Sequence, residues 1–177
     1  MVQRVAWARV LVDGAVTALL GRPPGSDQGV GDTSSLPAPG LLCLVGVARD
    51  DEAASATALA RRIFHLRVLD DEHGRMGASV AATGGGVVVV SQFTLYGDTT
   101  RGRRPSWSDA APRATAELLV AEVAAELGRL GCPVGTGRFG AEMLVELGND
   151  GPVTILLEEP VGGRRSRGGQ AAAPETT

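Results

Sequence analysis

Four consecutive valines, residues 87–90, constrain this chain more than any other stretch of its sequence. Valine is enriched in strands, and an unbroken apolar run leaves neither face of a strand for water. Residues 41–48 form a second continuous apolar run. We therefore expect two buried strands that are covered on both faces. A chain of 177 residues, 44% of them apolar, is long enough to supply that cover within one core.

Two segments have the apolar periodicity of amphipathic helices. The first follows Asp50 and Asp51, which we expect to cap its N-terminus, and ends near Leu66. The second has Pro112 in its first turn and Gly131 just past its end, where helices often stop. The apolar stripes that predict these helices are Ala56, Leu59, Ala60, Ile63 and Phe64 in the first, and Ala116, Leu119, Val120, Val123, Leu127 and Leu130 in the second.

Turn residues divide the remaining apolar stretches into further strands. Residues 4–12 and 16–20 flank an Asp-Gly pair and predict a hairpin. Near the C-terminus, residues 142–147 and 153–157 flank an Asn-Asp-Gly-Pro sequence that predicts a second hairpin. Pro152 has a fixed φ and no N–H group, so we place it at a strand start or a sheet edge. The pattern alone leaves open whether this Gly-Pro pair is an ordinary turn or a close backbone approach to a ligand.

Composition predicts one folded domain, residues 1–159, with a flexible loop and a tail. Residues 22–39 are rich in Pro and Gly and have no apolar period, which indicates a loop. Residues 160–177 also lack periodicity and predict a disordered tail. A net charge of -3 argues against a protein that coats nucleic acid by bulk charge. No apolar run approaches the roughly 18 residues of a membrane span and no signal peptide is recognisable, so we expect a cytoplasmic protein.

Residues with catalytic chemistry are few. Cys43 and Cys132 have no plausible His partner and no metal-ligand spacing, so we expect neither a cysteine hydrolase nor a metal site. The polar residues Ser91, Gln92 and Thr94 follow the valine strand, and they either line a pocket or satisfy the strand end locally. The basic residues at 101–104, beside Trp107, either contact phosphates or belong to a solvated loop.

Two motifs give the chain a family resemblance. Residues 91–95 (Ser-Gln-Phe-Thr-Leu) and 149–154 (Asn-Asp-Gly-Pro-Val-Thr) resemble the signature motifs of the D-aminoacyl-tRNA deacylase family, also called D-tyrosyl-tRNA deacylase. The likeness covers residues 1–158, in order and with spacing close to the family's. The chain departs from the family in its longer 22–39 loop, in Trp107 where Phe is usual, and in its tail. Shorter matches lie at residues 2–5, 40–42, 44–47, 74–76, 104–106 and 136–143.

The resemblance implies a mixed α/β fold in three layers, β/β/α, with mostly antiparallel sheets and two helices. It implies a homodimer that hydrolyses the ester of D-aminoacyl-tRNA without a cofactor or metal, and that has no membrane or DNA partner. In the family, a cis Gly-Pro peptide of one subunit enters the other subunit's pocket and excludes the side chain of an L-amino acid. Glycine has no side chain, so glycyl-tRNA is also expected as a substrate.

The matched motifs also imply individual roles. The implied catalytic residues are Ser91, Gln92, Phe93 and Thr94; the implied substrate-binding residues are Gly151, Pro152, Phe139, Gly140, Ala141, Met143 and Arg4; and Arg101, Arg103 and Arg104 are implied to contact the acceptor stem. Residues 139–141 are expected to form the pocket for the 3′-terminal adenosine. Arg4 and Met143 are expected to pack near the Gly-Pro motif and hold its orientation.

The sequence offers no Ser-His-Asp set and no obvious paired carboxylates. Hydrolysis would then depend on positioning, on backbone N–H groups that stabilise an oxyanion, and on the 2′-OH of the terminal adenosine. Thr94 is either a nucleophile without a matched base or a residue that lines the pocket, and we favour the second role. Two alternatives are a same-fold deacylase that removes an L-amino acid, which the intact Ser-Gln-Phe-Thr motif argues against, and a non-catalytic module that binds the tRNA end.

Overall fold

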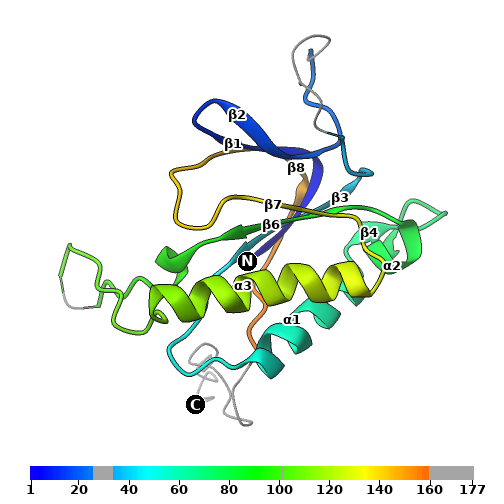
Figure 1. The fold of residues 1–177 in the computed structure, drawn as a ribbon. Coiled ribbons are helices and arrows are strands. Elements are labelled where there is room, and N and C mark those ends of the chain that lie inside the picture. The colour runs from blue at the N-terminus through cyan, green and yellow to red at the C-terminus, as the bar shows by residue number, and fades with distance from the viewer. Residues whose placement is uncertain (26–33, 101, 160–177) are drawn as a thin grey trace, which may run out of the picture.

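The computed structural model describes residues 1–25, 34–100 and 102–159, and Figure 1 shows its fold. Arg101, the predicted tail and the middle of the predicted loop lie outside the described residues. In chain order the elements are β1 (Val2–Val12), β2 (Ala15–Leu20), β3 (Gly40–Val45), α1 (Ala53–His65), β4 (Leu69–Asp70), β5 (Met76–Ala78), α2 (Val80–Thr83), β6 (Val87–Ser91), the 3-10 helix η1 (Phe93–Tyr96), α3 (Arg113–Arg129), β7 (Val134–Thr136) and β8 (Leu144–Ile155).

One six-stranded sheet organises the fold, in the order β2-β1-β3-β6-β7, with β8 also paired to β1. β1 is antiparallel to β2, β3 and β8, whereas β3, β6 and β7 run parallel to one another. The predicted mixed α/β class is confirmed. The predicted mostly antiparallel pairing is also confirmed, and the parallel part is the layer of β3, β6 and β7 beneath the helices. The connections through α1 and α3 cross over and return the chain to the same end of the sheet.

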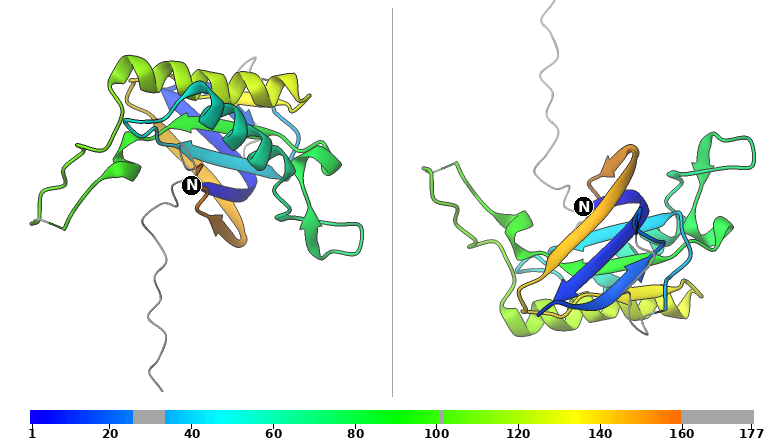
Figure 2. Two further views of the ribbon diagram at one scale, coloured as in Figure 1. Left: turned by 90° about the horizontal axis from the view of Figure 1, so that it is seen from below. Right: turned by 90° about the horizontal axis from the view of Figure 1, so that it is seen from above.

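The sheet curls so that β2 approaches β6 and β7, and α1 and α3 pack side by side over one face (Figures 1 and 2). The valine strand β6 therefore lies between two apolar clusters. Val88 and Val90 belong to the cluster between the two sheet layers, and Val87 and Val89 belong to the cluster that the helices cover. Each valine is at most 2% exposed. The predicted cover on both faces is confirmed, and burying a side chain of this size stabilises the fold by about 1.5–3 kcal/mol.

The start of α1 differs from the prediction. Its N-cap residue is Glu52, which makes no side-chain cap hydrogen bond, so the predicted capping by Asp50 and Asp51 is wrong. The Asp51 carboxylate instead accepts a hydrogen bond from the N–H group of Ala48 at 2.8 Å. A short aspartate side chain satisfies the turn that precedes the helix and is then not available to the helix itself.

The ends of α3 follow the prediction closely. Pro112 is its N-cap residue, and Gly131 follows its end with a φ of 85°, the left-handed conformation that glycine adopts without strain. Leu119, Val123 and Leu127 of the predicted stripe are buried. No helix within the described ranges is long and apolar enough to cross a membrane.

A single bulged strand, β8, replaces the second hairpin that the sequence predicted. Both halves of β8 pair with β1 in the same direction, so the chain does not reverse there. Asn149 pairs with Val5 and Thr154 with Gln3, so a single residue of β1 faces residues 150–153 of β8. These residues bulge beyond the sheet (Figure 2). β1 is the one partner of β8 among the described strands, which confirms the predicted edge position of the proline.

Candidate functional site

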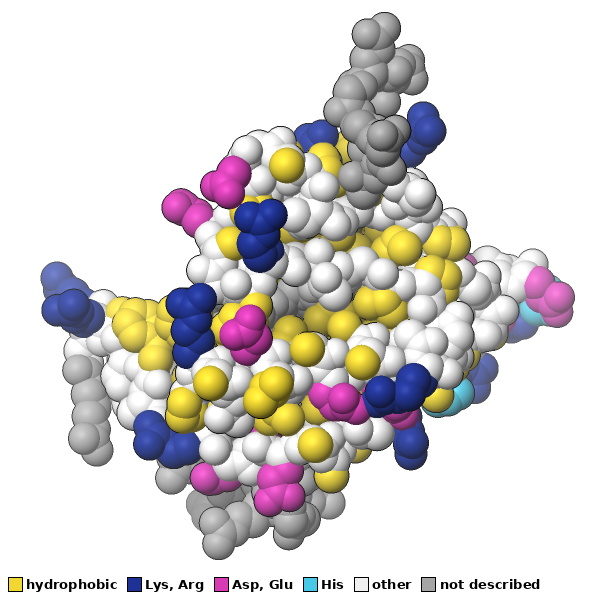
Figure 3. Space-filling model, viewed as in Figure 1, with side chains coloured by type: hydrophobic (Ala, Val, Ile, Leu, Met, Phe, Trp, Pro, Cys, Tyr) yellow, Lys and Arg dark blue, Asp and Glu magenta, His cyan; other side chains and the backbone are white. Residues whose placement is uncertain are grey.

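A cavity of about 620 Å³ opens at the carboxyl ends of β3 and β6. Parallel strands place these ends at one edge of a sheet, where ligand sites commonly form. The remaining walls come from the start of α3, the loop before it and the connection between β7 and β8. Apolar side chains also gather on the surface between the β1–β2 hairpin and α3 (Figure 3). Most described lining residues are apolar, and Arg113 is the single charged one.

The polar residues that follow the valine strand lie at this cavity. Ser91, Gln92 and Phe93 all line it. The N–H group of Gln92 donates to the carbonyl of Val45 at 2.7 Å, which ties the end of β6 to the end of β3. The chain then turns into η1, where Thr94 is exposed and is not among the residues that line the cavity. The hydroxyl of Thr94 accepts a hydrogen bond from the side-chain amide of Gln92.

Phe139, Gly140 and Ala141 line the cavity from the connection between β7 and β8. A Cβ atom on Gly140 would lie 2.2 Å from Nη2 of Arg113, so glycine is what allows this guanidinium to approach. The Cζ atom of Arg113 also lies 6.0 Å from the centroid of the Phe139 ring. The sequence pattern gives no signal for Arg113, because nothing links the first residue of α3 to a connection that follows β7.

The loop before α3 contributes an aromatic side chain to the cavity wall, whereas its described arginines do not line the cavity. Trp107 lines the cavity, and its ring centroid lies 5.7 Å from that of Phe93. Arg103 and Arg104 belong to the same loop, are exposed and are not among the lining residues. Contact between these arginines and an acceptor stem stays a prediction.

The Gly-Pro motif lies far from the cavity of its own chain. The Gly151-Pro152 peptide bond is cis, as the resemblance implied. It bulges from one end of β8, whereas Met143 lines the cavity at the other end of that strand. The β1 residues opposite these ends, Gln3 and Leu11, are about 26 Å apart at about 3.3 Å per residue. An extended strand holds Met143 and the motif of the same chain apart, so the packing of Met143 near a Gly-Pro motif stays a prediction that only a second copy of the chain could meet.

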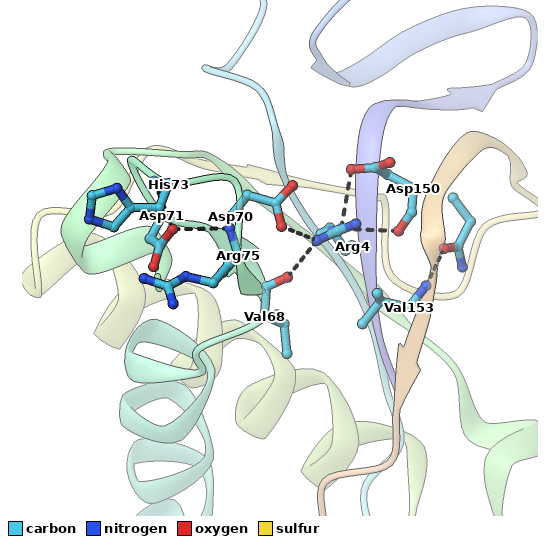
Figure 4. A network of polar contacts seen from close by, with 9 residues as sticks. Arg4, Val68, Asp70, Asp71, His73, Arg75, Asp150 and Val153 are labelled. Atoms are coloured by element: carbon cyan, nitrogen blue, oxygen red, sulfur yellow. Dashed lines mark hydrogen bonds and ion pairs between the residues drawn. The ribbon is translucent and has the colours of Figure 1, made fainter. Parts of the chain in front are cut away.

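Arg4 joins the bulge to the β4–β5 turn (Figure 4). Its Nε atom donates to the carbonyl of Asp150 at 3.0 Å and lies 3.1 Å from the carboxylate of the same residue. Its Nη1 atom donates to the carbonyl of Val68 at 3.2 Å and to the carboxylate of Asp70 at 2.9 Å. The Arg4 side chain is only 11% exposed, so these acceptors take the place of water. Arg4 thus fixes the residue before Gly151 against a second element of the fold.

Side chains of the motif also close the bulge from within. The amide oxygen of Asn149 accepts a hydrogen bond from the N–H group of Val153 at 2.9 Å. The amide nitrogen of Asn149 donates to the hydroxyl of Thr154 at 3.1 Å, and Gln3 donates to the same hydroxyl at 3.3 Å. These hydrogen bonds span the base of the bulge and therefore hold its outer residues in a fixed position relative to β1.

No nucleophile with a matched base lines the cavity among the residues that the structure describes. Burial raises the pKa of the Cys43 thiol to about 12 and that of Cys132 to about 11, and neither thiol lines the cavity. His65 ends α1 and His73 lies in the turn between β4 and β5. The described ranges also contain no cluster of three or more His, Cys, Asp or Glu residues placed to hold a metal ion.

Comparison with known proteins identifies the family. A family model described as D-Tyr-tRNA(Tyr) deacylase matches residues 1–158. A D-aminoacyl-tRNA deacylase of Mycolicibacterium smegmatis is 51% identical over 89% of this chain and 97% of that protein. One from Nocardia farcinica is 52% identical with the same coverage.

Solved structures agree in fold. The structure of a protein named c-Myc DNA Unwinding Element Binding Protein shares 33% identity and a TM-score of 0.75, over 90% of this chain and 97% of that one. A probable eukaryotic D-amino acid tRNA deacylase shares 12% identity and a TM-score of 0.63, over 85% and 93%. The present chain belongs to the D-aminoacyl-tRNA deacylase family, whose members are hydrolases of the aminoacyl-tRNA ester bond.

Proposed function

We propose that this protein hydrolyses the ester bond of D-aminoacyl-tRNA and releases a free D-amino acid and tRNA. One observation supports the proposal: Ser91, Gln92 and Phe93, which we expect to be catalytic, line the same cavity as residues 139–141, which we expect to hold the terminal adenosine. The relatives that carry this activity in their names are about half identical to the chain.

The chemistry that suits this cavity is attack by water on an ester that is already activated. Water adds to the carbonyl carbon, the bond from that carbon to the ribose oxygen breaks, and the ribose oxygen takes up a proton. The first N–H groups of a 3-10 helix have no acceptor within the helix, and η1 begins at Phe93 beside the cavity. Such donors stabilise the oxyanion that develops during attack. Thr94 has no nucleophilic role in this scheme, since its hydroxyl is engaged by Gln92 outside the lining.

Selection against L-amino acids would come from the Gly151-Pro152 bulge of a second copy of the chain. About 26 Å of strand separates this bulge from the cavity end of β8, so it has no access to the cavity of its own chain. A homodimer that inserts each bulge into the other subunit's cavity removes this separation. Backbone carbonyls would meet the substrate amino group, and the crowded backbone would exclude an L side chain. Glycyl-tRNA has no side chain to exclude and is therefore a substrate in this proposal.

A paired deacylation assay tests the proposal. The full-length protein is incubated with D-tyrosyl-tRNA, L-tyrosyl-tRNA and glycyl-tRNA, and the rate of ester hydrolysis is measured for each. We expect turnover of the first and third and none above background for the second. Turnover of the L-form would indicate a same-fold editing enzyme for L-amino acids. Binding of all three without turnover would indicate a module that only recognises the tRNA end, and either result overturns the proposal.

A further inference from the structure

The cavity contains one cation without a counter-ion. Arg113 is the single charged residue among the described residues that line it. Within the described ranges, no carboxylate forms an ion pair with Arg113. Arg113 is an exposed residue that also lines the apolar cavity, so its guanidinium is accessible to an anion that enters from solvent.

Its neighbours hold this guanidinium at the wall. The Phe139 ring lies 6.0 Å from Cζ of Arg113, and Gly140 lets Nη2 approach the backbone of the connection between β7 and β8. The side chain thus reaches from the start of α3 to the residues expected to hold the terminal adenosine. A guanidinium presents its donors in a planar fork, which matches two oxygens of a phosphate.

The distribution of charge in the proposed substrate indicates which of its groups Arg113 would bind. The amino group of an aminoacyl ester is a cation that Arg113 repels, and the ester itself carries no charge. The one anion close to the terminal adenosine is the phosphodiester on its 5′ side. Arg113 therefore favours an orientation in which the phosphodiester lies at its end of the cavity and the amino acid lies away from it.

We infer that Arg113 is a binding residue for the phosphodiester that precedes the terminal adenosine, and that it sets the direction in which the tRNA end enters the cavity. This inference rests on the proposed function for the identity of the ligand. It concerns binding and leaves the chemical step to the residues that follow β6.

A neutral analogue of the ligand provides a sharp test. The dinucleotide CpA, the last two nucleotides of tRNA, and its uncharged methylphosphonate analogue are titrated into the wild-type protein and into Arg113→Gln. We expect the wild type to bind CpA about tenfold more tightly than the analogue, as one charge-assisted contact predicts. Arg113→Gln binds the two equally, and Arg113→Lys lies between them because it keeps the charge without the fork. Arg75→Gln, which removes an equivalent exposed charge from the β4–β5 turn, retains the tenfold preference.

Deacylation supplies an independent readout. For D-tyrosyl-tRNA we expect Arg113→Gln to raise KM with little change in kcat, and to lower the slope of log kcat/KM against log salt by about 0.7, the value for one phosphate of a single strand. The inference is overturned if the wild type and Arg113→Gln prefer CpA over its methylphosphonate analogue to the same degree. It is also overturned if Arg113→Gln weakens the binding of CpA and of the analogue equally. If the wild type shows no deacylation, the proposed function fails while the dinucleotide titration still decides the role of Arg113.

Discussion

Replacing Arg4 by Met removes the guanidinium that holds the Gly-Pro bulge and keeps most of the apolar stem. Two carbonyls, those of Asp150 and Val68, lose a charged donor, and the Arg4 site is 11% exposed, so water replaces it poorly. The carboxylates of Asp70 and Asp150 are 51% and 44% exposed, so each ion pair contributes at most about 1 kcal/mol. Adding these contributions, we expect Arg4→Met to lower the free energy of unfolding by about 2–4 kcal/mol.

Urea denaturation followed by circular dichroism measures this loss, at one fixed protomer concentration because the proposed dimer makes stability concentration-dependent. Arg9→Met is the matched control on the same strand. Arg9 is 29% exposed and its ion-pair partner among the described residues is Glu146, so we expect a loss of about 1 kcal/mol or less. Equal losses for the two variants would mean that the hydrogen bonds from Arg4 to the carbonyls of Asp150 and Val68 add no stability beyond that of an ion pair.

The same pair of variants separates stability from selectivity. We expect Arg4→Met to loosen the rejection of L-tyrosyl-tRNA, because Asp150 precedes Gly151 and loses its anchor. Arg9→Met should leave the ratio of D- to L-deacylation unchanged. If Arg4→Met remains folded and keeps the wild-type ratio of D- to L-deacylation, then Arg4 does not orient the bulge.

Three further predictions test the site and the core. Thr94→Ala should leave kcat for D-tyrosyl-tRNA within about twofold; a hundredfold loss would instead make Thr94 part of the chemistry. Burial raises the pKa of Cys43 to about 12 and of Cys132 to about 11, so at pH 8 a thiol reagent should label them only after unfolding, and rapid labelling of the native protein would contradict their burial. Glu126 has its pKa lowered chiefly by a hydrogen bond from Arg129, so its stabilisation is present above the unfolded pKa of about 4.3 and is lost as pH falls through the folded value. Glu126→Gln should therefore lower Tm more at pH 7 than at pH 3, and an equal loss at both would exclude the carboxylate as the cause.

Features that depend on a few neighbouring residues were predictable from the sequence. Residues 87–90 admit water on neither face, and they form a strand between two apolar clusters. Pro112 and Gly131 bound α3 because each restricts or permits backbone conformations at its own position. The polar residues Ser91 and Gln92 were expected either at a pocket or at a locally satisfied strand end, and the structure brings them to the cavity.

Features that depend on pairing across the fold were not predictable in this way. An Asn-Asp-Gly-Pro sequence indicates a local departure from extended structure, which serves a hairpin or a bulge equally well. Only the pairing of both halves of β8 with β1 decides for the bulge. The predicted capping of α1 by Asp50 and Asp51 is wrong for a related reason. The Asp51 carboxylate accepts a hydrogen bond from the N–H group of Ala48 before the helix begins.

Residue order alone establishes the two motifs, the buried central strands and the family to which the chain belongs. These follow from residue types at fixed short spacings, which neither packing nor register alters. Two other features are visible only in the folded chain: the Gly151-Pro152 bulge lies at the far end of β8 from the cavity, and Arg113 lies at the cavity wall beside Phe139. Register between strands and the path of a crossover helix bring together residues that are far apart in the chain. Spacing along the sequence carries no record of those distances.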